Sequence, residues 1–335
     1  MPLAFYQDSR YFKQMEVHIP NSAFLGNING FLSTLKLDNP DFLKITANPK
    51  WISVHPLILC IIGILGKNIP ADKITCELIA APSGHYLKRM KLFEFMGINP
   101  GVKEIVEHEP AGRFIPLTQV KNSNDLDYFL KDLVPLLHFD NDPKHVKSIQ
   151  HIFSELIRNV LEHSRSSDGA VVCAQYFKKT NKISIGVADM GIGLQKSLSQ
   201  SYPVKDSIEA INLALTPGVT GTTSKPGGTA QNAGFGLFLI KSIAYTGGNF
   251  FNIMSGDKMY KLLQKKKSSF KLSGDPFKDR HSIISIPFWT GVAVGVDISL
   301  EKTTEFSSLL DNIHDFYSKE VRGQKKARYK RPKFE

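Results

Sequence analysis

Short apolar runs alternate with helix-like segments along the first 120 residues of the chain. Strands are predicted at residues 15–19, 42–46, 74–80 and 113–117, and helices at residues 21–37, 55–67 and 86–96. Gly97 follows the last of these helices, at a position where glycine favours a C-cap. Alternating strands and helices predict a small α/β layer domain at residues 1–120.

Two helical patterns open the second part of the chain. Leucine and phenylalanine side chains fall on one side of residues 122–137, which predicts a linking helix within residues 121–140. A longer helix is predicted from Pro143 to about Ser164, because its apolar residues repeat with a 3.6-residue period. Asn141 and Asp142 stand before Pro143 and are typical of a helix start.

A hairpin pattern and a glycine-rich stretch follow this helix. Strand patterns at residues 170–177 and 183–187 are joined by a polar turn. The polar stretch 216–236 is rich in Gly and Thr, and a loop of that length is usually functional or disordered. It leads into a helical pattern at residues 237–245. A strand at residues 292–298 closes a second domain, predicted over residues 141–300, before an amphipathic helix and a basic tail at residues 301–335.

The composition is that of a globular protein, since 42% of the 335 residues are hydrophobic and 22% are charged. The longest apolar stretch, residues 52–65, contains His55 and Pro56 and is too short to cross a bilayer, so no membrane contact is predicted. The N-terminus lacks the pattern of a secretory signal. The three cysteines have no metal-binding spacing, which favours buried thiols in the cytoplasm.

The net charge of +11 is concentrated in two segments. Residues 258–280 and residues 319–335 each carry eight Lys or Arg against two acidic residues. One interpretation is a contact surface for nucleic acid or another polyanion. The other is a solvated loop and a disordered tail, which the lack of regularly interleaved aromatic residues favours.

Candidate chemistry first occurs along the helix predicted from Pro143. Glu155, Asn159 and Glu162 stand at i, i+4 and i+7 and form one polar stripe, with His163 at its edge. An amide oxygen such as that of Asn159 is a ligand that Mg²⁺ accepts. Glu155 is placed to orient or deprotonate a water molecule. The alternative is an ordinary solvated stripe on a helix that packs by its other face.

Two further segments add candidate groups. Asp189 ends the second strand of the hairpin, where a carboxylate can accept the exocyclic amine of adenine, and Gly191 and Gly193 let backbone approach a ligand. The glycine-rich stretch ends at a helix start, which offers N–H groups and the helix dipole to phosphates, and Lys225 adds a charge. Taken singly, these segments also fit a plain turn and a glycine linker.

Together the three motifs resemble those of the GHKL ATPase superfamily. Residues 155–164 resemble its N-box, Asp189-Met-Gly-Ile-Gly193 its G1 box, and Gly234-Phe235-Gly236-Leu237 its G2 box. The order and spacing agree, and the resemblance covers about residues 140–300. It implies a Bergerat-fold α/β sandwich, in which a mixed sheet is covered by helices, that binds ATP and Mg²⁺. The Glu162-His163 pair after Asn159 is similar to the histidine kinase and anti-sigma kinase branch.

The resemblance implies roles for the matching residues. Asn159 would be the Mg²⁺ ligand, Asp189 the adenine contact, and Glu155 the general base if ATP is hydrolysed. Residues 234–237 would contact phosphates. The sequence departs from the family at its later Gly-Thr pair, which stands here in reversed order as Thr290-Gly291, and in a basic insertion at residues 258–280.

The N-terminal region weakly resembles the STAS domains that partner anti-sigma-type kinases. The matching stretch offers only Ser53 as a phosphate acceptor, and a structural or oligomerising domain is the plainer alternative. The favoured function is therefore an ATPase or an ATP-driven switch that acts on its N-terminal domain, a second copy or a protein partner. The alternatives are an anti-sigma-type Ser/Thr kinase and a nucleic-acid-associated ATPase switch.

Overall fold

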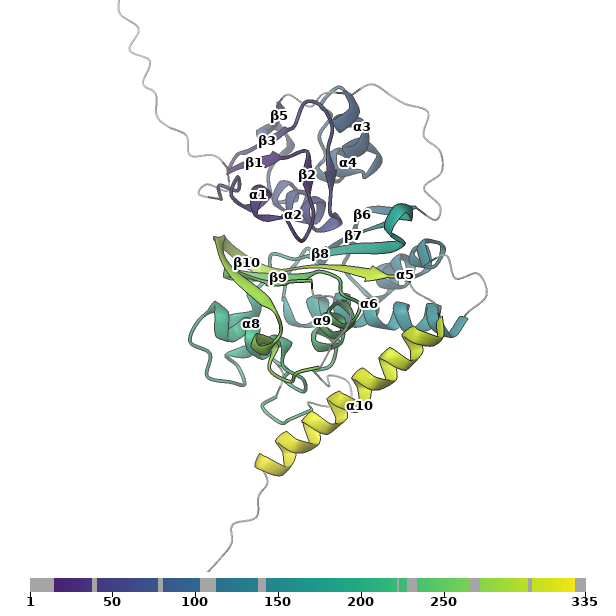
Figure 1. Cartoon of the computed structure of the whole chain (residues 1–335). Helices are drawn as coiled ribbons and strands as arrows, with labels where there is room; N and C mark the ends of the chain where they lie inside the picture. The colour runs from purple at the N-terminus through teal and green to yellow at the C-terminus, as the bar shows by residue number, and fades with distance from the viewer. Residues whose placement is uncertain are drawn as a thin grey trace, which may run out of the picture.

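The computed structural model describes residues 15–37, 41–77, 81–102, 113–137, 143–221, 223–227, 234–264, 272–300 and 303–328. It is a mixed α/β structure in layers (Figure 1). An N-terminal layer lies on one face of a large β-sheet, and helices cover the other face. No helix in the described ranges is long and apolar enough to cross a membrane.

The N-terminal layer is built on short parallel strands with alternating burial. Within the described ranges, β1 (Met15–Ile19), β3 (Leu43–Ala47) and β5 (Ile74–Glu77) form a three-stranded sheet in the order β1-β3-β5. A second parallel pair joins β2 (Ser22–Ala23) to β4 (Ser53–Val54). Ser53, the candidate phosphate acceptor, is half-buried in β4. The helices of this layer are α1 (Asn29–Leu32), α2 (Pro56–Lys67), η1 (Ala71–Lys73), α3 (Ala81–Arg89) and α4 (Leu92–Met96).

Two helix predictions in this layer need correction. The helix predicted at residues 21–37 is wrong, because Asn27 accepts a hydrogen bond from Phe24 N over 2.7 Å and turns the chain before the short α1. The helix predicted at residues 86–96 is interrupted at Lys91, whose φ of 57° is left-handed. The expected C-cap at Gly97 is confirmed by its φ of 71°.

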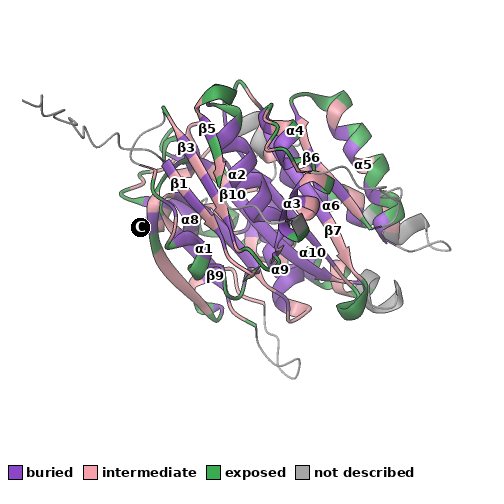
Figure 2. Ribbon diagram, turned by 90° about the horizontal axis from the view of Figure 1, so that it is seen from above, coloured by how far each residue is buried: buried purple, intermediate pink, exposed green. Residues whose placement is uncertain are grey.

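Helix α2 is buried along nearly its whole length between the N-terminal layer and the large sheet (Figure 2). It begins at His55, whose Nδ1 accepts the Leu57 N–H over 3.0 Å, and Pro56 fixes its first turn. One side packs on β7 and β8, where Gly186 leaves room for the backbone of Leu57. His55 Nε2 also lies 3.4 Å from Asp297 Oδ1 of β10, so polar contacts cross the same interface.

The large sheet has the strand order β6-β7-β8-β10-β9 in the described ranges, and every neighbouring pair is antiparallel. Its strands are β6 (Phe114–Val120), β7 (Ala170–Phe177), β8 (Lys182–Ala188), β9 (Phe251–Leu262) and β10 (His281–Ser299). The sequence pattern assigned the strand near residues 113–117 to the N-terminal domain, but β6 pairs with β7. The local sequence pattern identifies a strand, but it does not show which other strand will pair with it.

Helices on the opposite face complete the core. They are α5 (Ser123–Leu137), α6 (Pro143–His163), α7 (Gly193–Leu198), α8 (Ser207–Leu215), α9 (Gly236–Thr246) and α10 (Thr303–Arg328), and the short turns η2 (Lys178–Thr180) and η3 (Pro276–Lys278) join strands. The cap expected at Asn141 and Asp142 lies outside the described residues. Helix α10 ends at Arg328, so it continues into the basic segment 319–335, for which a disordered tail was one interpretation. A single glycine, Gly323, costs too little to end a helix.

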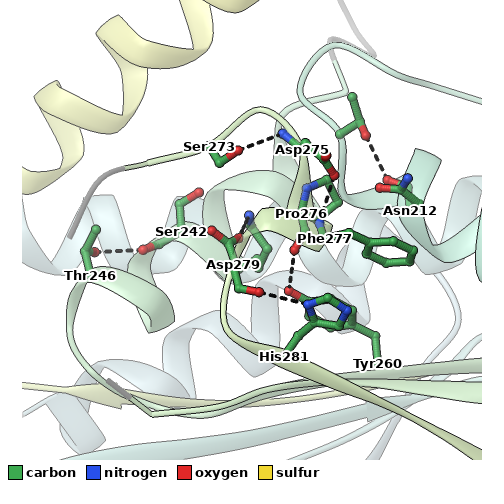
Figure 3. Close-up of polar contacts among 12 residues, drawn as sticks. Asn212, Ser242, Thr246, Tyr260, Ser273, Asp275, Pro276, Phe277, Asp279 and His281 are labelled. Carbon is green, nitrogen blue, oxygen red and sulfur yellow. Dashed lines mark hydrogen bonds and ion pairs between the residues drawn. The ribbon is translucent and has the colours of Figure 1, made fainter. Parts of the chain in front are cut away.

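The described part of the segment expected as a basic insertion, residues 258–264 and 272–280, comprises the end of β9 and the turn with η3 that leads into β10. We call residues 272–280 the hairpin base, and Figure 3 shows how it is fixed to the helical layer. Lys241 of α9 and Asp279 form a buried ion pair, and Tyr260 donates its hydroxyl to Pro276 O over 3.0 Å. The rings of Tyr260, Phe277 and His281 stack beside them. The hairpin base is therefore a packed part of the protein.

Candidate functional site

One cavity brings the three sequence motifs together. It opens between α6, α9, the turn after β8 and the segment after α8, and its volume is about 100 Å³. Its lining includes the polar and glycine positions Glu155, Asn159, Asp189, Gly193, Thr220, Gly221, Gly234 and Gly236, and the apolar residues Leu156, Leu194, Leu198, Ala214, Val219, Phe235, Leu237, Val292 and Val294.

Asp189 is the buried carboxylate of this cavity. It follows the last residue of β8 and is fully buried. Its Oδ1 accepts the Gly191 N–H over 2.7 Å, and its Oδ2 accepts the Val292 N–H over 3.1 Å. Burial raises the pKa of Asp189 to about 7, although both N–H groups act to lower it. The carboxylate is therefore held in place by backbone and remains ready to accept a further hydrogen bond from a ligand.

Two glycines allow close approaches that shape the cavity. Gly191 packs directly on Ser164 at the end of α6, where any side chain would collide with the Ser164 carbonyl. A Cβ at Gly236 would lie 2.6 Å from Asn159 Nδ2 and 3.3 Å from Glu155 Cβ. A side chain at residue 236 would therefore have to displace the Asn159 amide from its place on the polar stripe of α6.

The N-terminus of α9 forms another part of the cavity wall. Phe235 stands at the N-cap, and its ring cannot accept a hydrogen bond from the first turn. The first helical residues are Gly236 and Leu237, which also line the cavity. Because no side chain in the described part of the chain caps this turn, its N–H groups and the positive end of the helix dipole are available to an anion.

Glu155 lies one turn before Asn159 on α6 and is partly exposed. Its Oε1 is 3.3 Å from Nη1 of Arg158, which also donates from Nη2 to Ser154 Oγ over 3.4 Å. Both Glu155 and Asn159 line the cavity. Within the described ranges, no group of three or more His, Cys, Asp and Glu side chains could hold a metal ion.

Some predicted site residues do not join this group. The side chains of Glu162 and His163 lie outside the described part of the chain. Thr290 is exposed in β10 and is not in the cavity lining. Lys225 is also exposed and outside the lining, and its backbone N–H donates to Thr223 Oγ1 over 3.2 Å. The reversed Thr290-Gly291 pair instead brings Gly291 against the backbone of Asp189.

The sequence interpretation missed the supports of the site. Trp289 donates its indole N–H to Asp189 O over 3.0 Å. Ser255 accepts the Leu194 N–H over 3.0 Å and donates to Gly291 O over 2.8 Å, which fixes the start of α7. The one relevant sequence signal is the spacing of Val292 and Val294, which are two positions apart in β10 and both line the cavity.

No protein-family model matches this chain, and no curated protein matches it. The functional interpretation therefore depends on the site itself.

Proposed function

We propose that the chain binds Mg²⁺–ATP in the cavity between α6 and α9, as a GHKL-type nucleotide-binding protein. The observation that carries the proposal is that a buried hydrogen-bond acceptor, Asp189, and the free N-terminus of α9 line the same cavity. An adenine nucleotide has the matching parts, since its amine donates a hydrogen bond and its phosphates are anionic.

In this proposal each part of the lining has one role. Asp189 accepts the adenine amine, and the base lies among apolar side chains such as Val292 and Leu194. The N–H groups at the start of α9 bind phosphate oxygens. Asn159 supplies its amide oxygen to Mg²⁺, which neutralises phosphate charge. Glu155 orients water for attack on the terminal phosphate.

Binding is tested by titrating ATP with and without Mg²⁺. We expect Asp189→Asn to lose at least tenfold in affinity, because an amide has only one acceptor oxygen, whereas both oxygens of Asp189 accept backbone N–H groups and one must also accept the adenine amine. Asn159→Ala should lose the Mg²⁺-dependent part of the affinity. Asp72→Asn, at an exposed carboxylate of η1, is the matched control. Unchanged affinity in Asp189→Asn would exclude the adenine assignment.

The use of the bound nucleotide is a separate question, and we favour hydrolysis or an ATP-driven switch. Glu155 beside the cavity supports hydrolysis. Incubation with ATP labelled at the γ-phosphate distinguishes the alternatives. Label released as free phosphate supports an ATPase, label on protein supports a kinase, and retained ATP supports a sensor that binds without turnover.

A further inference from the structure

The segment that follows α8 lies between the cavity and the C-terminal helix. We call its described residues, 216–221 and 223–227, the lid segment. Val219, Thr220 and Gly221 line the cavity. Helix α10, 26 residues long, runs across the helical layer and reaches this segment with its C-terminal turns (Figure 1).

The last turns of α10 bond directly to the lid segment. Gln324 Nε2 donates to Pro217 O over 3.0 Å. Arg328 donates to the carbonyl oxygen of Ser224 through Nη1 and to its hydroxyl through Nη2, the latter over 3.2 Å. Two polar side chains of one helix therefore hold both parts of the lid segment.

Apolar packing occupies the space between these bonds. Val321 packs against Gly218 and Gly227. A Cβ added at Gly218 would lie 2.8 Å from one methyl group of Val321, and a Cβ added at Gly227 would lie 2.7 Å from the other. Gly227 N donates to Gly218 O over 2.9 Å, and Gly218 N donates to Gly234 O over 3.1 Å. These bonds connect the lid segment to the start of the α9 motif, so a restraint on the lid segment also restrains Gly234.

An earlier turn of α10 contacts the α9 motif itself. The ring of Tyr317 lies 4.7 Å from the ring of Phe235, centroid to centroid, in an edge-to-face arrangement. Phe235 is the N-cap of α9 and lines the cavity. Helix α10 therefore contacts the glycine-rich stretch near both of its ends, at Pro217 and at Phe235.

These contacts differ from ordinary docking of a helix on its own core. Ile313 is fully buried, and Phe316 stacks with Phe238 of α9 at 6.1 Å, so this part of α10 closes the core. Gln324 and Arg328 instead contact backbone of the lid segment. Their side chains can be changed without opening the core.

We propose that Tyr317, Gln324 and Arg328 are positioning residues of the nucleotide site, which hold the lid segment and Phe235 against the cavity and so slow the dissociation of ATP. The inference depends on the proposed nucleotide binding. For ATP to leave, the lid segment has to move away from the cavity, and that movement breaks its bonds to α10. The α10 contacts, together with the bonds from Ser201 Oγ to Gly221 O and from the Tyr202 hydroxyl to Thr223 O, therefore raise the barrier to dissociation.

The first test measures the dissociation of a fluorescent ATP analogue by stopped flow. The variant Gln324→Ala/Arg328→Ala should release it on the order of tenfold faster, which corresponds to about 1.4 kcal/mol, with its melting temperature unchanged. Arg328→Lys, which keeps one donor, should fall between the two rates. The control is Arg322→Ala/Lys326→Ala, two exposed cations on the same turns. Equal release by the double variant and the wild type would overturn the proposal.

A second test needs no nucleotide. Amide hydrogen exchange at residues 218–221 and 223–227 should be faster in Gln324→Ala/Arg328→Ala than in the wild type and the control. Unchanged exchange would refute the restraint by α10 even if ATP binds. A wild-type protein that binds no ATP would refute the nucleotide proposal, while the exchange measurement would still decide whether α10 restrains the lid segment.

Discussion

Trp289 donates its indole N–H to the main-chain oxygen of Asp189 over 3.0 Å. The donor belongs to the core shared with the N-terminal layer, and the acceptor residue lines the cavity. Asn68 stands at the C-cap of α2, and its Nδ2 donates a hydrogen bond to the sulfur of Met190 over 3.5 Å. The N-terminal layer therefore contacts the same turn that presents the carboxylate to a ligand.

The first prediction concerns this bond. Trp289→Phe keeps an aromatic ring but removes the N–H, which leaves the Asp189 carbonyl without its donor and costs about 1–3 kcal/mol. We expect lower thermal stability and weaker ATP binding by on the order of tenfold. Trp51→Phe is the control, since that indole is 50% exposed. Calorimetric titration that finds equal affinities for the three proteins would contradict the role of Trp289.

The second prediction follows from the raised pKa of Asp189. Adenine donates a hydrogen bond and prefers the ionised carboxylate, so ATP affinity should fall as the pH drops below about 7. Inosine presents a carbonyl oxygen at the same position and prefers the protonated carboxyl. The ratio of ATP to ITP affinity should decrease from pH 8 to pH 6, and this ratio cancels the titration of the phosphates. A constant ratio would argue against contact with Asp189.

The same pKa affects stability. The native pKa of about 7 lies above the ordinary value of 3.8, so the native protein binds more protons than the unfolded chain between these values. Asp189 therefore lowers the free energy of unfolding as the pH rises from about 4 to about 7, by up to about 4 kcal/mol. Urea unfolding of the wild type and Asp189→Asn isolates this contribution, because asparagine does not titrate. Parallel pH profiles would contradict it.

The third prediction compares two glycines in helices. Gly236→Ala places a methyl group 2.6 Å from Asn159 Nδ2, which should cost about 1–3 kcal/mol of stability and reduce Mg²⁺-dependent binding. Gly323→Ala enters open space in α10 and should stabilise by roughly 0.5–1 kcal/mol. Melting temperatures should therefore move in opposite directions. A shift in the same direction for both would show that the close approach at Gly236 is absent.

The fourth prediction concerns the ion pair that fixes the hairpin base. Lys241→Met leaves Asp279 charged and buried, which should cost about 3–5 kcal/mol in urea unfolding. The double variant Lys241→Met/Asp279→Leu should recover most of this loss. Glu77→Gln, which breaks the exposed Lys44–Glu77 pair, is the control and should cost less than about 1 kcal/mol. Equal losses in the single and double variants would mean that packing, not charge, stabilises the base.

The fifth prediction separates binding from chemistry. Glu155→Gln keeps the size of the side chain but removes the base, so ATP should bind with unchanged affinity while hydrolysis falls by about 10²–10⁴-fold. Phosphate release under saturating ATP measures the effect. Unchanged hydrolysis would remove Glu155 from the mechanism.

Local periodicity predicted the elements that carry the motifs. The α6 helix and the β7–β8 hairpin lie within a residue or two of their expected bounds, because their apolar patterns repeat cleanly and end at Pro or polar turns. The candidate residues Asn159, Asp189 and Gly236 meet in one cavity, as the order of the motifs suggested.

Contacts between segments that lie far apart in the chain could not be predicted from the sequence. The pairing of β6 with β7, the bond from Trp289 to Asp189 and the bond from Gln324 to Pro217 join residues at least 50 positions apart. No local pattern encodes such partners. The helices α7 and α8 were missed because both are short, and propensity summed over so few residues is a weak guide.

The burial of α2 on both sides has a practical consequence for how the chain can be divided. Cutting near residue 120 would strip β6 from the edge of the large sheet and expose the apolar surface of β7 and β8 that α2 covers. The two halves should therefore unfold in a single cooperative transition and fail to fold when expressed apart. A displacement of the N-terminal layer would then be transmitted to the large sheet through the packing of α2 on β7 and β8.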